Sequence, residues 1–257
     1  MEISKFLKSK GMSNKTIKIY TQVINKISQN LGKDFGEEEL ENYLAELNLS
    51  PRTYNLYRSI MNFYTTKYLN YSLTFKKAKL DDSLPSFVSE EEFKKVLDTI
   101  PNWKHNLILK VMYQSGLRIS EAVRLKKYQV NTENLTILVK EGKGKKDRYT
   151  IIPKNLAPEF IAYFNKLDFK EKEFIFPAFR EHITEASIQE RLKKAIKDSD
   201  SKHFTAHDLR HSFAINLVNK GIDLEILRRL LGHYSIKTTQ IYLKSRTIDL
   251  TKIANLL

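Results

Sequence analysis

Two arginines, two histidines, a lysine and a tyrosine stand in five short motifs between residues 116 and 242. In chain order the motifs are Gly-Leu-Arg-Ile-Ser-Glu at 116–121, Gly-Lys-Gly at 142–144, His-Asp-Leu-Arg at 207–210, Leu-Gly-His at 231–233 and a tyrosine at 242. Side chains of these types act together only where a fold brings them within hydrogen-bonding reach. A common site therefore requires a chain that returns to one place from five separate segments.

The chain of 257 residues is strongly basic. It holds 44 Lys and Arg against 30 Asp and Glu, which gives a formal net charge of +14 and a pI of about 9.6. Such an excess favours a polyanionic partner such as nucleic acid, because each phosphate that a basic side chain neutralises releases counterions. Charge alone leaves an unspecialised basic surface equally open.

The chain contains no cysteine, which excludes disulfide bonds, thiolate nucleophiles and cysteine-based zinc sites. The sequence also has no apolar run long enough to span a bilayer and no signal-peptide core near its start. We therefore expect a cytoplasmic protein without membrane association. No carboxylate cluster of the kind that holds magnesium in nucleases is evident in the sequence, so we expect no metal and no cofactor.

The first 80 residues predict a small all-helical domain. Apolar residues at spacings of three and four after Ser13 predict a helix that ends at Gly32, with Ser13 as its N-cap. A second helix fits 37–47, where three glutamates in the first turn suit the helix dipole. A third helix begins at Ser50-Pro51, with serine as the N-cap and proline at the first helical position.

A short polar stretch at 81–86, interrupted by a proline, is the predicted linker, and a second domain is expected over 87–257. This domain begins with a helix after Ser89. Two β-prone runs at 135–139 and 148–152 predict an antiparallel hairpin, whose turn contains the two glycines of Gly-Lys-Gly. The expected fold class is therefore mainly α, with an α+β second domain that contains a small antiparallel sheet.

The His-Asp-Leu-Arg motif is predicted to open a helix. Thr205 is a good N-cap, and Asp208 three residues later completes a capping-box pair. His207 and Arg210 then lie three apart on one helical face, and we expect both to point away from the core. His211 has the same chemistry as His207, but we expect it to stand behind the site or on the surface.

Gly232 is the predicted end of a helix over 224–231, so His233 lies at an element boundary. Ser235 can cap a last helix that carries Tyr242. Taken singly, these residues have simpler interpretations. A histidine at a helix end is usually structural, and a tyrosine on an amphipathic helix is usually half-buried core.

The arginine and lysine motifs are equally ambiguous when each is taken alone. Glu121 follows Arg118 by three residues, so its carboxylate can orient the guanidinium, and the alternative is a surface ion pair of little energetic weight. Lys143 stands in a basic turn, which is also compatible with a solvated charged loop or with nonspecific phosphate contacts from its neighbours.

In combination, the five motifs resemble the catalytic signature of the tyrosine recombinases, most closely the Xer type and its single-recombinase archaeal form. Gly-Leu-Arg-Ile-Ser-Glu resembles the first-arginine motif of that family, Gly-Lys-Gly its lysine hairpin and Thr239-Gln-Ile-Tyr242 its nucleophile motif. His-Asp-Leu-Arg-His-Ser-Phe-Ala and Leu-Leu-Gly-His-Tyr-Ser resemble the motifs of the second arginine and the second histidine. The resemblance implies a helical core-binding domain over 1–80 and a catalytic domain over 87–257, which together form a clamp around duplex DNA.

The resemblance also implies a site in which a tyrosine attacks a DNA phosphate and forms a 3′-phosphotyrosyl bond. Glu121 is expected to support the first arginine. The implied catalytic residues are Arg118, Lys143, His207, Arg210, His233 and the nucleophile Tyr242. Four basic residues at and around the turn are expected to contact DNA: Lys140, Lys145, Lys146 and Arg148.

The expected activity is site-specific recombination without metal or ATP, with Xer-like chromosome dimer resolution favoured over integration or excision of a mobile element. The expected partners are double-stranded DNA with inverted binding arms and further copies of the chain in a synaptic tetramer. The apolar tail at 247–257 is expected to dock on a neighbouring protomer or on its own. A type IB topoisomerase and an inactive DNA-binding homologue stay open as alternatives, whereas a helix-turn-helix regulator would leave the Gly-Lys-Gly hairpin unexplained.

Overall fold

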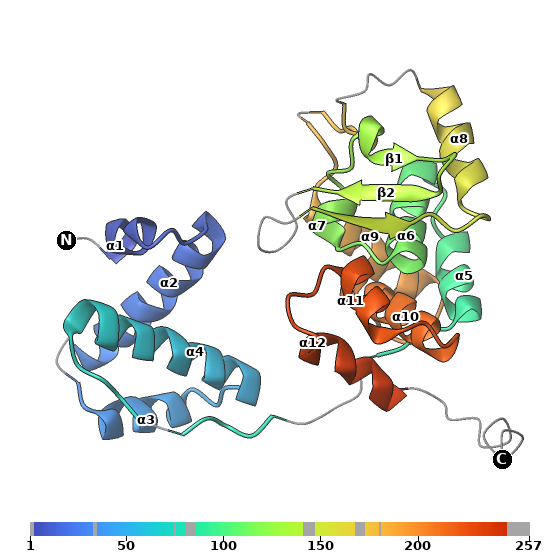
Figure 1. Cartoon of the computed structure of the whole chain (residues 1–257). Coiled ribbons are helices and arrows are strands. Elements are labelled where there is room, and N and C mark those ends of the chain that lie inside the picture. The colour runs from blue at the N-terminus through green and yellow to red at the C-terminus, as the bar shows by residue number, and fades with distance from the viewer. Residues whose placement is uncertain are drawn as a thin grey trace, which may run out of the picture. The chain divides into compact units, whose positions relative to one another are not determined.

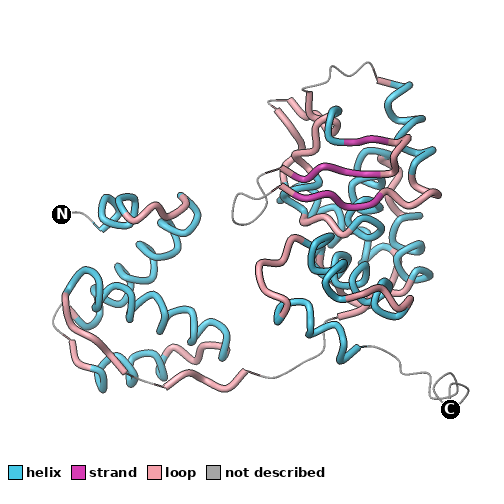
Figure 2. Tube along the Cα trace, in the orientation of Figure 1, coloured by secondary structure: helices cyan, strands magenta, loops and turns pink. Residues whose placement is uncertain are grey.

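The computed structural model describes residues 3–32, 35–74, 76–80, 86–140, 147–167, 173–179 and 181–245. The chain divides into two compact units, Met1–Asp82 and Ser83–Leu257 (Figure 1). Within the described residues every strand belongs to the second unit (Figure 2). No helix in this part of the chain has the length and apolar character needed to cross a membrane. The predicted linker at 81–86 lies, apart from Ser86, outside the described residues.

The first unit contains the three helices that the sequence predicts. They are α2 (Asn14–Leu31), α3 (Glu37–Glu46) and α4 (Pro51–Tyr64). The hydroxyl of Ser13 accepts a hydrogen bond from the backbone N of Thr16, and Ser50 does the same for Thr53. Both predicted N-caps are therefore confirmed.

Two further helical segments of this unit were not predicted. They are α1 (Ile3–Ser9) and a π-helix, η1 (Thr65–Leu69), which directly continues α4. The buried core of the unit is drawn from α2, α3 and α4 and includes Ile27, Leu40 and Ile60, none of which is exposed. The spacing of these apolar positions in the sequence predicts the three longer helices.

The second unit is mainly helical around a small sheet (Figure 1). Its helices are α5 (Glu90–Asp98), α6 (Trp103–Ser115), α7 (Ile119–Ala122), α8 (Ala157–Lys166), α9 (Glu185–Asp198), α10 (Ala206–Asn219), α11 (Leu224–Leu231) and α12 (Lys237–Gln240), with 3-10 helices η2 (Lys127–Gln129) and η3 (Ile241–Ser245). Helix α5 begins after Ser89 as predicted, and the structure adds that Ser89 is its N-cap, since its hydroxyl accepts a hydrogen bond from the backbone N of Glu92.

The sheet has the strand order β1 (Val130–Asn131), β2 (Thr136–Val139) and β3 (Arg148–Ile151), and both strand pairs are antiparallel. The predicted hairpin is confirmed as the β2–β3 pair, in which Val139 lies opposite Arg148. The short strand β1 was not predicted. The turn of the hairpin, residues 141–146, lies outside the described residues, so the predicted Gly-Lys-Gly turn is not described.

Helix α10 contributes to both hydrophobic clusters of the second unit. Its first turn supplies Ala206 and Leu209 to the large cluster that includes the sheet, and its later residues supply Phe213 and Val218 to a smaller cluster. Tyr242 belongs to this smaller cluster and is 2% exposed. Because α10 is covered along most of its length, its polar residues also face neighbouring elements.

Two predictions about these segments are wrong in detail. The expectation that His207 and Arg210 both point away from the core fails for Arg210, which is 1% exposed, because α6 packs against α10. The predicted last helix begins later than Ser235, with Ile236 at its N-cap position. Tyr242 lies in the following 3-10 helix η3.

Gly116 ends α6 and brings that helix close to α10. Its φ is +68°, a left-handed conformation that glycine adopts without strain. A Cβ at this position would lie 2.3 Å from Cδ1 of Phe213. Both the backbone conformation and the close approach of α10 therefore require glycine here.

Replacing Gly116 with alanine should destabilise the second unit more than the same change at Gly221. Gly221 also has a positive φ, +81°, but a Cβ there meets nothing within 4 Å. We expect Gly221→Ala to cost about 1 kcal/mol through backbone strain and Gly116→Ala about 2 kcal/mol more through overpacking. Urea unfolding followed by fluorescence of the single tryptophan, Trp103, measures both. Equal losses would show that the contact with Phe213 relaxes freely.

Candidate active site

The carboxylate of Glu121 binds three arginines from different elements. Its Oε1 accepts hydrogen bonds from Nη1 of Arg118 and Nη1 of Arg148, each at 2.8 Å. Its Oε2 accepts from Nη2 of Arg148 at 2.6 Å and lies 3.6 Å from Nη1 of Arg210. Burial alone would raise the pKa of Glu121, but the hydrogen bonds and charge of Arg148, with the charge of Arg210, lower it to about 2. The carboxylate is therefore ionised at neutral pH and fixes the three guanidinium groups.

Arg118 occupies the N-cap position of α7, one turn before Glu121. Its backbone N donates to Oε2 of Glu121 at 2.8 Å, in addition to the side-chain contact. The sequence prediction that Glu121 orients this guanidinium is therefore confirmed in its geometry. The interpretation as a surface ion pair fails, because the Glu121 side chain is only 9% exposed.

Arg210 is held by two backbone carbonyls as well as by the charge of Glu121. Its Nη1 donates to the carbonyl of Gly116 at 2.7 Å, and its Nη2 donates to the carbonyl of Leu231. Burial, followed by the charge of Arg118, lowers the pKa of Arg210 to about 9. The guanidinium therefore stays charged at neutral pH, and its hydrogen bonds hold it at the ends of α6 and α11.

Arg148 does not lie where a contact with a DNA phosphate was predicted. Besides its two bonds to Glu121, its Nε donates to the carbonyl of Leu230 at 2.9 Å, and its side chain is 8% exposed. A Cβ on Gly232 would come within 2.6 Å of Cδ of Arg148. Arg148 is therefore a buried link between β3, α7 and the end of α11. The sequence of β3 gives no local signal for this position, because its apolar residues Tyr149 and Ile151 are exposed while the polar Thr150 is buried on the same side as Arg148.

His233 follows the left-handed Gly232 that ends α11, as the sequence predicts. Its Nδ1 lies 3.0 Å from Oγ1 of Thr239, and its carbonyl accepts a hydrogen bond from Nη1 of Arg228 at 2.8 Å. Burial, then the charges of Arg210 and Arg118, lower the pKa of His233 to about 3. The imidazole is therefore neutral at neutral pH.

Tyr242 lies in the same chain's site, with its ring stacked on that of His233 at a centroid distance of 6.5 Å. Its hydroxyl is 2.9 Å from Nδ1 of His211. Burial raises the pKa of Tyr242, and the charges of Arg210 and Arg118 act in the opposite direction. The expectation that His211 stands behind the site or on the surface missed this direct contact with the tyrosine oxygen.

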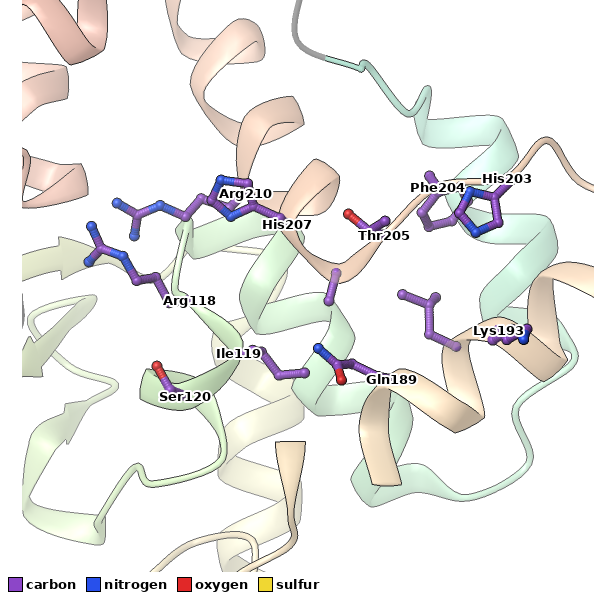
Figure 3. Close-up of a pocket in the computed structure, with 12 residues that line it drawn as sticks. Arg118, Ile119, Ser120, Gln189, Lys193, His203, Phe204, Thr205, His207 and Arg210 are labelled. Atoms are coloured by element: carbon purple, nitrogen blue, oxygen red, sulfur yellow. The ribbon is translucent and has the colours of Figure 1, made fainter. Parts of the chain in front are cut away.

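His207 shares a cavity of about 450 Å³ with the two arginines Arg118 and Arg210. In Figure 3 both guanidinium groups point to the side of the cavity away from Gln189 and Lys193. Loss of solvent around the imidazole, then the charge of Arg210, lower the pKa of His207. The cavity therefore presents two cations and a histidine together, which suits an anion such as phosphate.

Three of the predicted site residues, Lys143, Lys145 and Lys146, lie outside the described residues, as does the predicted docking tail at 247–257. Lys140 is described at the end of β2, where it is exposed and its Nζ lies 5.2 Å from the ring centroid of Tyr128. Of the six predicted catalytic residues, three line the cavity: Arg118, His207 and Arg210. His233 and Tyr242 lie against each other nearby, and the hydroxyl of Tyr242 contacts His211 on the helix that carries His207 and Arg210.

Comparisons with known proteins give matches over most of the chain. The Phage integrase family model matches residues 86–247, and the model of the phage integrase N-terminal SAM-like domain matches residues 2–74. Tyrosine recombinase XerA of Pyrococcus horikoshii is 32% identical over 254 residues, which cover 96% of this chain and 88% of the relative. XerA of Thermococcus kodakarensis is 33% identical over 261 residues, covering 98% and 92%.

Solved structures share the fold. One is the XerH site-specific recombinase bound to palindromic difH substrate, a post-cleavage complex, with a TM-score of 0.75 and 24% identity over 98% of this chain and 83% of that one. Another is the Tn1549 transposon integrase in complex with circular intermediate DNA, with a TM-score of 0.76 and 18% identity over 99% and 98% of the two chains. The small sheet among helices is thus an established recombinase fold.

Removing the Arg148 side-chain charge should destabilise the second unit far more than removing an exposed arginine. Arg148→Met leaves the buried Glu121 carboxylate without its bidentate partner, and we expect a loss of about 3 kcal/mol. Arg124→Met breaks a pair with Glu185 in which Arg124 is 57% exposed, and we expect a change within about 0.5 kcal/mol. Urea unfolding measures both variants, and a loss of similar size in the two would contradict the role assigned to Arg148.

Proposed function

The chain belongs to the phage integrase family as a Xer-type tyrosine recombinase, and we propose that Tyr242 is the nucleophile with which it cleaves and rejoins duplex DNA. The observation that carries the proposal is the placement of Tyr242, whose ring stacks on that of His233 and whose hydroxyl lies 2.9 Å from Nδ1 of His211, on the helix that also carries Arg210. Attack on the scissile phosphorus forms a 3′-phosphotyrosyl bond and releases a 5′ hydroxyl. That bond keeps the energy of the phosphodiester, so the step needs no ATP.

We assign Arg118 and Arg210 to the non-bridging oxygens of the scissile phosphate. A planar guanidinium matches the geometry of phosphate better than an ammonium group does. Fixed cations stabilise the charge that grows in the transition state without reorganising during the reaction. The shared contact with Glu121 supports this role, because it sets the direction of both groups before DNA arrives.

The two histidines and the lysine complete the proposed chemistry. His207 and His233 hydrogen-bond the same phosphate, since each neutral imidazole keeps one N–H to donate. Lys143 protonates the leaving 5′ oxygen as the general acid. The assignment of Lys143 rests on its Gly-Lys-Gly motif.

The solved relatives support duplex DNA as the proposed substrate. XerH and the Tn1549 integrase have been solved on DNA, and the basic charge of +14 supports the same partner here. We propose that the chain binds duplex DNA with inverted arms, with Lys140, Lys145 and Lys146 among its DNA contacts, and forms a synaptic tetramer on it. The XerA relatives favour chromosome dimer resolution in the cytoplasm as its task. Exchange of the tail at 247–257 between protomers is part of this proposal.

A nicked suicide duplex tests the nucleophile directly, because loss of the short leaving strand traps the covalent product. With a candidate site from the same genome, the wild-type protein should form a protease-sensitive adduct without metal or ATP. Tyr242→Phe should bind the duplex with unchanged affinity and form none, since it lacks the attacking oxygen. Gel electrophoresis after denaturation gives the adduct yield. An adduct with Tyr242→Phe would assign the nucleophile to another residue.

A second duplex in the same reaction separates recombination from topoisomerase activity. A recombinase joins strands from the two partners, whereas a type IB topoisomerase reseals each strand to its original end. Products of mixed length support recombination. Relaxation of supercoiled DNA without mixed products would favour the topoisomerase.

A further inference from the structure

The hydroxyl of Tyr242 is held by a histidine that the proposed mechanism does not use. Nδ1 of His211 lies 2.9 Å from this oxygen. Within the described part of the chain, this nitrogen is the hydrogen-bond partner of the Tyr242 hydroxyl. Tyr242 itself is 2% exposed. A buried phenol that must lose its proton during attack therefore has one nitrogen base in direct contact with the reacting atom.

The two histidines already assigned to the phosphate are less suited to this proton. His233 faces the tyrosine ring, with centroids 6.5 Å apart and the planes inclined by 15°, and its Nδ1 is engaged with Thr239. His207 packs edge-on against His211 at a centroid distance of 4.3 Å and lines the cavity of the two arginines. The three histidines therefore have different positions. His207 and His233 are assigned to the phosphate, and His211 contacts the hydroxyl of Tyr242.

We propose that His211 is a further catalytic residue, which accepts the proton of Tyr242 as its oxygen attacks the phosphorus. This proposal rests on Tyr242 being the nucleophile. It places the proton acceptor on α10, one helical turn after His207 and next to Arg210 in the sequence. One helix then carries a phosphate ligand, a transition-state cation and the base.

The ionisation states agree with this role. Burial first, then the charge of His207, lower the pKa of His211 to about 4, so the imidazole is neutral at neutral pH. In the proposed tautomer its one proton is on Nε2, and Nδ1 accepts the hydrogen bond of the phenol. Burial raises the pKa of Tyr242, so the phenol keeps its proton at rest. A bound phosphate would bring negative charge to Arg210, whose own charge opposes protonation of His211, and would make the transfer easier. The ionisable groups that act on His211 are His207, Asp208, Arg210, His233 and Tyr242.

The proposed step balances in both directions. In cleavage the bond between Oη and phosphorus forms, the bond from phosphorus to the 5′ oxygen breaks, the phenol proton passes to Nδ1 of His211 and Lys143 gives a proton to the leaving oxygen. In rejoining, the 5′ hydroxyl attacks and its proton passes to the neutral Lys143. The tyrosine oxygen then leaves and takes its proton back from the His211 imidazolium, which restores the starting state.

The test uses a substitution that keeps the hydrogen bond but removes the base. In His211→Asn the amide oxygen stands near the position of Nδ1 and can accept a hydrogen bond, yet it cannot take a proton. We expect the rate of adduct formation on the suicide duplex to fall about 100-fold, with DNA binding unchanged. His182→Asn is the matched control, because this histidine contacts a backbone carbonyl and Phe174 instead, and it should cleave at the wild-type rate.

A duplex with sulfur in place of the bridging 5′ oxygen locates the defect. A thiolate leaves without protonation, so Lys143→Ala should regain cleavage on this duplex while His211→Asn should not. Cleavage by His211→Asn within threefold of wild type would overturn the proposal, and so would its recovery on the sulfur duplex. If His211→Asn fails to fold by Trp103 fluorescence, His211→Gln takes its place. An adduct with Tyr242→Phe would instead refute the nucleophile assignment and is scored separately.

Discussion

The buried carboxylate of Glu121 is the interaction on which the rest of the site depends. It binds Arg118, Arg148 and Arg210, which come from α7, β3 and α10. A buried ion is stable only when it is well paired, so the three elements must meet in one arrangement. One carboxylate against three guanidinium groups leaves an excess of positive charge, and a phosphate is the anion that suits it.

Within this network some residues hold elements together and others are proposed to contact the phosphate. Arg148 donates hydrogen bonds to Glu121 and to the carbonyl of Leu230, and so joins the sheet to the end of α11. Arg210 is anchored to the carbonyls of Gly116 and Leu231. Tyr242, the proposed nucleophile, is positioned differently, because its ring is part of a hydrophobic cluster and its oxygen contacts His211. Apolar packing therefore fixes the tyrosine, whereas charge pairing fixes the arginines.

The sequence predicts helix caps, helix ends and the hairpin, which depend on neighbouring residues. It does not predict side-chain positions that depend on contacts between distant segments. The caps at Ser13 and Ser50, the start of α5 after Ser89, the β2–β3 hairpin and the helix end at Gly232 all follow from neighbouring residues, and the structure confirms them. The inward positions of Arg148 and Arg210 cannot be predicted in this way, because burying a cation is favourable only beside a partner that another segment supplies. The contact of His211 was missed for the same reason, since its partner Tyr242 lies 31 residues away.

In the proposed mechanism each chain uses its own Tyr242 beside its own Arg118 and Arg210. Mixing two inactive variants, Tyr242→Phe and Arg210→Ala, on one suicide duplex with two arms tests this most directly. If Tyr242 works beside the arginines of its own chain, every protomer in the mixture lacks either the nucleophile or a transition-state cation, and no adduct above the level of the separate variants should form. Adduct formation on mixing, with the tyrosine of the Arg210→Ala chain attached to DNA, would show that the nucleophile is delivered to a neighbouring chain and would contradict the account.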